Sequence, residues 1–122
     1  MIKFIQCVRS RSDLSLQQFR EYWQQYEARV RRVAEVSGAL RATLDTGLAV
    51  DANLDVMASR GTTAPFEGVA EILWERSPDL AALAQDPAVR AAIGAMRQLQ
   101  AEFVDLERST FFFARADDVY PG

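Results

Sequence analysis

The chain has 122 residues, enough for one domain with a single core and too few for two ordinary domains. Nearly half of the residues are apolar and a quarter are charged, as in a globular protein, and no apolar run approaches the roughly 18 residues of a membrane span. The net charge is −3, without the basic face that a dedicated nucleic-acid-binding protein needs. We therefore expect one domain, residues 1–122, whose partner is neither a membrane nor a nucleic acid.

The sequence has no histidine and one cysteine, Cys7. Transition-metal and haem sites normally use imidazole, so we expect no metal site and no cofactor. The alternative is a Mg²⁺ or Ca²⁺ site made of carboxylates alone, but the sequence has no loop of the D-x-D-x-D type. Any general acid or base must then be Asp, Glu, Tyr, Lys or Cys. A single cysteine forms no internal disulfide, and the first residues lack the pattern of a signal peptide. These features favour a cytoplasmic location.

The first half of the chain predicts a strand, a long helix and a second strand. Residues 2–9 are rich in β-branched and aromatic residues, which favours a strand. Ser15 is a typical N-cap for a helix from Leu16 to Val36, and Gly38 is a typical helix breaker. Residues 39–50 predict the second strand. The apolar positions of the helix recur every three or four residues and so share one face: Leu16, Phe19, Trp23, Tyr26, Val30 and Val33.

The second half repeats this order. Residues 51–65 show no periodicity and contain Asn, Gly, Thr and Pro, so we expect a loop; residues 66–75 predict a strand. Ser77-Pro78-Asp79 and Asp86-Pro87 are both helix-start signals, and they predict a short helix followed by a longer one from Pro87 to about Leu106. Residues 108–116 predict the last strand. The longer helix has its own apolar stripe: Val89, Ile93, Met96, Leu99, Phe103 and Leu106.

Two β-α-β units in succession predict an α+β fold, the ferredoxin-like βαββαβ sandwich, with a four-stranded antiparallel sheet and helices on one face. In the strand 66–75, one set of alternating positions is wholly apolar and the other mixes Val69 and Leu73 with glutamates such as Glu71. A half-apolar second face needs a cover, so we expect a homodimer formed by sheet-to-sheet packing. In it, Glu71 would pair with Arg41 or Arg115 across the interface.

Three segments resemble the EthD family of dimeric α+β barrel proteins: LSLQQFREYWQQY at 14–26, FEGVAEILWE at 66–75 and FVDLERSTFFFARADDV at 103–119. The resemblance covers nearly the whole chain. It implies a homodimer whose two sheets close a barrel, and a ligand pocket between the sheet and the helices of each protomer. It also implies cofactor-free chemistry on small, largely aromatic or polyketide-like molecules. Relatives commonly place a histidine where this chain has Tyr26.

Tyr26 and Gln6 are the candidate catalytic residues. A phenol titrates near about pH 10, so it is a poor base at neutral pH but a competent proton donor or anchor for a developing oxyanion. Alternatively, Tyr26 is a core tyrosine bonded to a backbone carbonyl, and Gln6 bonds a neighbouring side chain. Gly68 and Gly94 leave volume vacant and favour a cavity over a filled core. The residues expected to line it and bind substrate are Phe4, Phe19, Trp23, Gly68, Ile72, Trp74, Val89, Met96 and Phe113.

These observations predict a cofactor-independent lyase, isomerase or cyclase that acts on a small hydrophobic substrate, aromatic or polyketide-derived. The alternative is a non-catalytic protein that binds a small molecule or supports an oxidative catabolic or biosynthetic pathway. The missing histidine favours this alternative. Titratable chemistry in the pocket would favour the enzyme.

Overall fold

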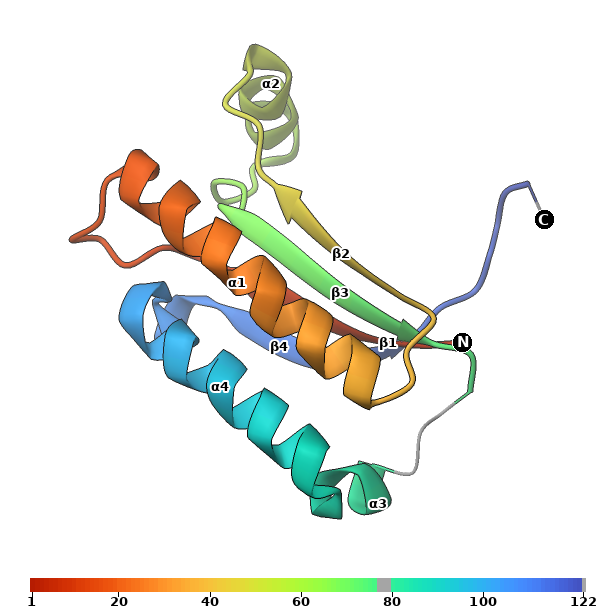
Figure 1. Ribbon diagram of the computed structural model, residues 1–122. Helices are drawn as coiled ribbons and strands as arrows, with labels where there is room; N and C mark the ends of the chain where they lie inside the picture. Colours follow the sequence, from red (N-terminus) through yellow and green to blue (C-terminus); the bar gives the residue numbers. More distant parts are fainter. Residues whose placement is uncertain (77–79, 122) are drawn as a thin grey trace.

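The computed structural model describes residues 1–76 and 80–121, and its strands form one antiparallel sheet in the order β2-β3-β1-β4 (Figure 1). The predicted α+β, ferredoxin-like fold is therefore confirmed. The prediction that Ser77 starts a helix lies outside the described residues. In chain order, the elements are β1 (Ile2–Val8), α1 (Leu16–Val36), β2 (Arg41–Thr46), α2 (Asp51–Arg60), β3 (Gly68–Trp74), α3 (Leu80–Gln85), α4 (Pro87–Phe103), a 3-10 turn (Leu106–Arg108) and β4 (Thr110–Arg115).

Capping residues fix the start of α1. The Ser15 hydroxyl accepts from the Gln18 backbone N–H at 3.1 Å, and the Gln18 side chain accepts from the Ser15 N–H at 2.8 Å, a reciprocal capping box. The helix ends at Val36 because Gly38 adopts φ 71°, a left-handed conformation that glycine enters without strain. Its buried face holds five of the six predicted residues. Leu16 is 52% exposed, because it lies in the first turn, beyond the end of the core.

The longer helix, α4, begins as predicted. The Asp86 carboxylate accepts from the Ala88 and Val89 N–H groups at 2.9 and 3.2 Å, and Pro87 fills the first helical position. The helix ends at Phe103, three residues before the predicted end, because Val104 turns to an extended conformation and forms a β-bridge with Ser10. Leu106 therefore lies in the 3-10 turn, 54% exposed, and is not part of the apolar stripe.

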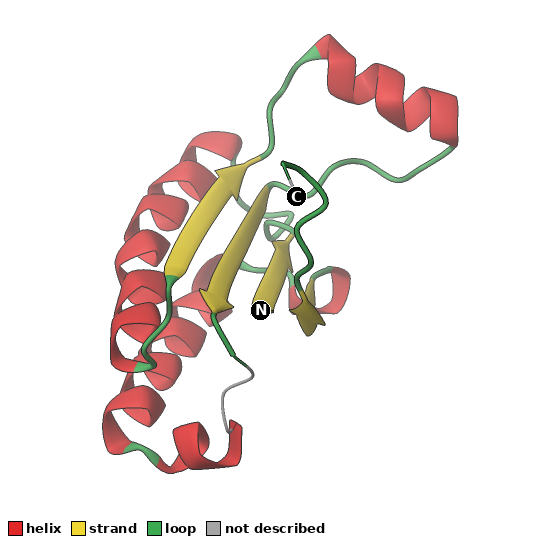
Figure 2. Ribbon diagram, turned by 90° about the vertical axis from the view of Figure 1, so that its right-hand side faces the viewer, coloured by secondary structure: helices red, strands yellow, loops and turns green. Residues whose placement is uncertain are grey.

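The loop predicted at 51–65 is wrong, because Asp51–Arg60 forms the helix α2. Of the residues that suggested a loop, Asn53 lies within the helix, whereas the glycine, threonines and proline follow it, and Gly61 (φ 63°) terminates it. None of the α2 residues is buried, and Leu54 and Val56 are exposed. Figure 2 shows α2 projecting away from the sheet and from the other helices. We call residues 48–66, which comprise α2 and the segments that connect it to the sheet, the arm.

The remaining strands are shorter than predicted. The β2–β3 ladder closes at Thr46 opposite Gly68, so residues 47–50 and 66–67 fall outside it. At this end a Cβ on Gly47 would lie 2.5 Å from the Phe66 carbonyl oxygen, so the close approach of the two backbones requires glycine. β4 likewise begins at Thr110, after the 3-10 turn, rather than at residue 108.

One face of the sheet carries α1 and α4, which lie side by side across it (Figures 1 and 2). No described helix packs on the other face, which we call the uncovered face. The register places Thr43, Glu71, Ile5 and Phe112 in one row on the uncovered face. Within the chain Glu71 pairs with Lys3, at 3.6 Å, because Lys3 lies diagonally opposite on β1. Its pairing with Arg41 or Arg115 across a dimer stays a prediction. This face is thus half apolar, as the alternation in the sequence predicts. None of the described helices combines the length and the apolar character that a membrane span requires.

Candidate functional site

A cavity of about 380 Å³ lies between the sheet and the helices α1, α3 and α4. We call it the sheet–helix cavity. Ile72, Val89 and Met96 form its buried interior, whereas Ala84 and Phe113 are exposed and mark its mouth. Six of the nine residues predicted to bind substrate line it: Phe4, Ile72, Trp74, Val89, Met96 and Phe113. The other lining residues are Val33, Ser37, Leu83, Ala84, Ile93, Arg97, Gln100 and Phe111.

The other predicted binding residues, Phe19, Trp23 and Gly68, lie away from the sheet–helix cavity. Phe19 and Trp23 stack on each other, with ring centroids 5.5 Å apart, in a buried cluster with Phe103. A Cβ on Gly68 would lie 2.6 Å from a carbon of the Trp23 ring, so the space that Gly68 leaves is filled by that indole. Gly94 is exposed, on the outer side of α4. The glycines therefore do not create the cavity, contrary to the expectation from the sequence.

Aromatic rings from three strands form the wall of the cavity nearest its mouth. Phe4 on β1 and Phe113 on β4 are directly opposite in the register, and their ring centroids are 4.8 Å apart. The Trp74 ring lies 6.4 Å from that of Phe113, and its indole N–H donates to the Ser37 hydroxyl at 3.1 Å. That hydrogen bond fixes the orientation of the indole. The wall therefore presents preorganised aromatic surface to a ligand.

The predicted catalytic pair meets in the core behind the cavity. The Tyr26 hydroxyl donates to the Gln6 side-chain oxygen and accepts from Gln100 Nε2 at 2.6 Å; Gln6 Nε2 approaches the Met96 sulfur at 3.6 Å. We call these four residues the polar cluster. Tyr26 and Gln6 are both 0% exposed, and neither lines the cavity. The alternative that Gln6 bonds a neighbouring side chain is confirmed, and the partner of Tyr26 is that amide rather than a backbone carbonyl.

The Met96 sulfur sets the direction of the whole hydrogen-bond chain. A thioether only accepts, so the Gln6 NH₂ group must face Met96 and its oxygen must face Tyr26. Tyr26 therefore donates to Gln6, and its hydroxyl oxygen accepts from Gln100. No described residue donates to the side-chain oxygen, Oε1, of Gln100. Since Gln100 lines the cavity, its amide is the cluster's polar group available to a ligand.

Burial raises the pKa of the Tyr26 phenol well above its ordinary value, and the hydrogen bond from Gln100 lowers it only in part. The phenol is therefore neutral at physiological pH. A neutral, fully bonded hydroxyl cannot act as a general base, but it can hold two amides in fixed orientations. Tyr26 is therefore placed to hold the Gln100 side chain in a fixed orientation.

Gln100 is the site residue that sequence reasoning missed. It lies four residues after Met96 and three before Phe103, and so shares the buried face of α4. The predicted stripe contains only apolar residues, and the neighbouring Leu99 has a spacing that fits it equally well. A polar residue at a stripe position is the signal that could have found it, because a buried amide needs a hydrogen-bond partner.

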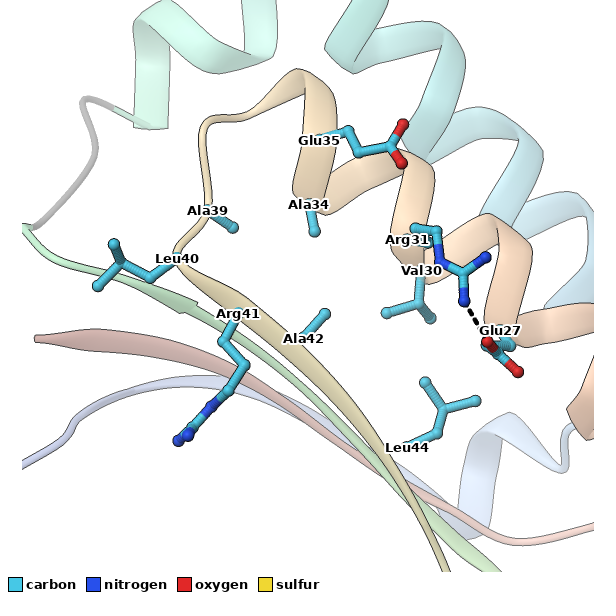
Figure 3. A pocket seen from close by; sticks show the side chains of 10 residues that line it. All are labelled: Glu27, Val30, Arg31, Ala34, Glu35, Ala39, Leu40, Arg41, Ala42 and Leu44. Carbon is cyan, nitrogen blue, oxygen red and sulfur yellow. Dashed lines mark hydrogen bonds and ion pairs between the residues drawn. The ribbon is translucent and has the colours of Figure 1, made fainter.

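A second hollow, of about 470 Å³, lies between α1 and the edge strand β2 (Figure 3). Its wall is largely small or aliphatic, with Ala34, Ala39 and Ala42 lining it. Both of its carboxylates are paired on α1: Glu27 with Arg31, and Glu35 with Arg32 at 3.8 Å. These charged groups already satisfy each other at the rim, so the hollow lacks the convergent polar groups of a binding site.

Other reactive groups do not form a site. Cys7 lies half-buried on the uncovered sheet face, where burial and the Glu71 carboxylate raise the pKa of its thiol. Within residues 1–76 and 80–121, no three Asp, Glu or Cys side chains gather closely enough to hold a metal ion.

Comparison with known proteins gives one family and a common fold. Residues 11–107 match the EthD domain. An EthD family protein from Bacillus halodurans is 13% identical, with a TM-score of 0.62 and coverage of 96% of this chain and 99% of the other. The hydroxynitrile lyase from Passiflora edulis is 12% identical (TM-score 0.61, 98% and 96% covered). A dimeric protein of ferredoxin-like fold and unknown function from Bacteroides fragilis is 9% identical (TM-score 0.61, 94% and 95% covered). A search of curated proteins gave no match.

Proposed function

This chain belongs to the EthD family, and we propose that it acts on a small hydrophobic molecule in the sheet–helix cavity as a cofactor-independent lyase, isomerase or cyclase. The substrate class that fits is aromatic or polyketide-derived. The observation that carries the proposal is an apolar cavity with a single oriented amide, Gln100, presented from its buried end. A hydroxynitrile lyase of the same fold supports the idea that this architecture accommodates such chemistry.

The proposed chemistry follows from what the cavity offers. The aromatic wall would hold and desolvate a planar substrate, so that one reactive conformer is selected. The second N–H of Gln100 would donate to a developing enolate or phenolate oxygen, and its carbonyl would accept from a substrate hydroxyl. Tyr26 and Gln6, predicted as catalytic from the sequence, would act as positioning residues that hold Gln100 in place.

The protein is also proposed to be a homodimer. The similar Bacteroides fragilis protein is described as dimeric, and the half-apolar face formed by residues such as Ile5 and Phe112 favours sheet-to-sheet packing. Such a dimer would cover the sheet face opposite the helices and leave the mouth of the cavity, at Ala84, open.

Native mass spectrometry of the freshly purified protein, followed by denaturing extraction, tests the binding step. We expect dimers that carry or take up a small aromatic molecule. Ala84→Trp places a large side chain at an exposed position of the cavity mouth and should reduce the occupancy without unfolding the protein. A protein that is purified without a bound molecule and also fails to take up added aromatic compounds would overturn the proposal.

Turnover of the extracted compound class, measured without added cofactor, tests the catalytic step. Gln100→Leu should lower turnover at least about tenfold, whereas Gln98→Leu, at an exposed position of the same helix, should not. Tyr26→Phe should also lower turnover, by no more than Gln100→Leu, because it acts through Gln100. Equal turnover in the wild type and Gln100→Leu would contradict the assigned role.

The second candidate function is a non-catalytic binding or accessory protein that supports an oxidative pathway. The specific observation in its favour is that the Tyr26 hydroxyl is fully buried and has both of its hydrogen bonds occupied inside the protein. A protein that binds the extracted compound tightly and returns it unchanged over a broad pH range would favour this function. Product formation would favour the enzyme.

A further inference from the structure

The sheet–helix cavity carries a positive charge at its mouth. Among the described residues that line it, Arg97 is the only charged side chain. Arg97 is exposed, whereas Met96 and Gln100, also on α4, are buried. The guanidinium therefore lies at the boundary between solvent and the apolar interior.

Within the part of the chain that the structure describes, Arg97 has no carboxylate partner. Arg31 and Arg108, by contrast, pair with Glu27 and Asp105. Exposed Arg90 has no carboxylate partner among the described residues either, so what distinguishes Arg97 is its place in the cavity lining. On α4 the positions three and four residues from Arg97, where a helical ion pair would form, are Ile93, Gly94, Gln100 and Ala101. None of them is acidic, so no neighbouring residue on α4 neutralises the positive charge at the mouth.

We propose that the ligand of this cavity is a small aromatic carboxylate whose negative charge pairs with Arg97. This inference rests on the proposed function, because it takes the sheet–helix cavity as the ligand site. A carboxylate deep in the apolar interior would lose its hydration without compensation, whereas at the mouth it keeps water and gains the guanidinium. The planar guanidinium of arginine can bond both oxygens of a carboxylate, so it favours a carboxylate over an anion with a single accepting atom.

The positions of Arg97 and Gln100 also orient the ligand. They are three residues apart on α4 and therefore neighbours along one side of the helix, with Arg97 at the mouth and Gln100 buried. The carboxylate would point outward, the ring would lie against Phe4 and Phe113, and a substituent on the ring would reach the Gln100 amide. The charge would thus fix which end of the molecule enters first.

Isothermal titration with 2-naphthoate and its neutral isostere 2-naphthamide tests the proposal at neutral pH. The wild type should bind 2-naphthoate about 5- to 10-fold more tightly than 2-naphthamide, the gain of a charge-assisted pair at a solvated mouth. Arg97→Gln should remove this preference and leave 2-naphthamide binding within about twofold. The matched control is Arg90→Gln, which makes the same charge change at an exposed α4 position outside the cavity lining and should retain the preference.

The outcomes separate the two proposals. Equal binding of the two compounds by the wild type, or a preference that survives Arg97→Gln, would overturn the assignment of the anion and leave the cavity proposal standing. Loss of the preference in Arg90→Gln as well would show that net charge, and not Arg97, causes it, and would overturn the assignment too. Binding of neither compound up to about 1 mM would overturn the cavity as an aromatic ligand site, and this inference with it.

Discussion

Replacing Tyr26 by Phe tests whether the polar cluster holds the core together. The change removes one hydroxyl and leaves the Gln6 oxygen without a donor and Gln100 Nε2 without its acceptor. Each orphaned buried group costs about 1–3 kcal/mol. Gln6 is fully buried and bears the full cost, whereas Gln100 can turn toward the cavity and bears less. We therefore expect the free energy of unfolding to fall by about 2–3 kcal/mol, which for a domain of this size lowers Tm by roughly 8–12 °C.

A double-mutant cycle measured by chemical denaturation checks this reasoning. Gln6→Leu removes the orphaned amide, so Tyr26→Phe should cost at least about 1 kcal/mol less in the Gln6→Leu background than in the wild type. All variants are compared at one protein concentration, because association would shift the apparent stability. A loss below about 0.5 kcal/mol for Tyr26→Phe, or strictly additive effects in the cycle, would refute the idea that the cluster is a coupled structural unit.

Three further predictions follow from the described residues. Gly68→Ala should lower the free energy of unfolding by about 1–3 kcal/mol, because the added methyl overlaps the buried Trp23 ring. A loss below about 1 kcal/mol, measured by calorimetry, would show that the ring can shift. Gly94→Ala should raise stability by about 0.4–1 kcal/mol in denaturant titrations, since its Cβ meets nothing within 4 Å and the unfolded chain loses freedom; a destabilised variant would count against that view. The raised pKa of Tyr26 should make stability fall as pH rises above about 10, where the phenol ionises in the unfolded chain but not in the folded one. In Tyr26→Phe that alkaline slope should be shallower, and an unchanged slope would exclude Tyr26 as its source.

Local rules predicted the elements whose ends are fixed by single side chains. Ser15 and Asp86 cap α1 and α4 at the predicted residues, because a side-chain oxygen that accepts the first free N–H groups is a short-range interaction. The fold class followed from the order of these elements. The helix α2 was missed because it has no buried face, so its residues show little of the periodicity by which a helix is recognised.

The site was predictable only in part, because sequence does not show which buried residues face empty space. Phe19 and Trp23 lie on the apolar stripe of α1 as Val89 and Met96 lie on that of α4, yet the first two pack against other rings and the last two line the cavity. The difference depends on a distant residue, Gly68, which admits the Trp23 ring. The role of Gln100 was not predicted for a related reason, since it depends on Tyr26, which is 74 residues away in the chain.

The arm enters and leaves the domain where Gly47 donates to the Glu67 carbonyl at 3.0 Å, so the β2–β3 ladder is closed beneath it. The cavity uses the other end of β3, at Ile72 and Trp74. Because none of the α2 residues is buried, the helix can open and exchange its amide hydrogens without loosening the core. Residues 64–66 of the arm are held to the domain, because the buried Arg9 guanidinium donates to the Ala64 and Pro65 carbonyls and lies over the Phe66 ring. Changes in the length or sequence of α2 alone should therefore leave both this anchor and the cavity unaltered.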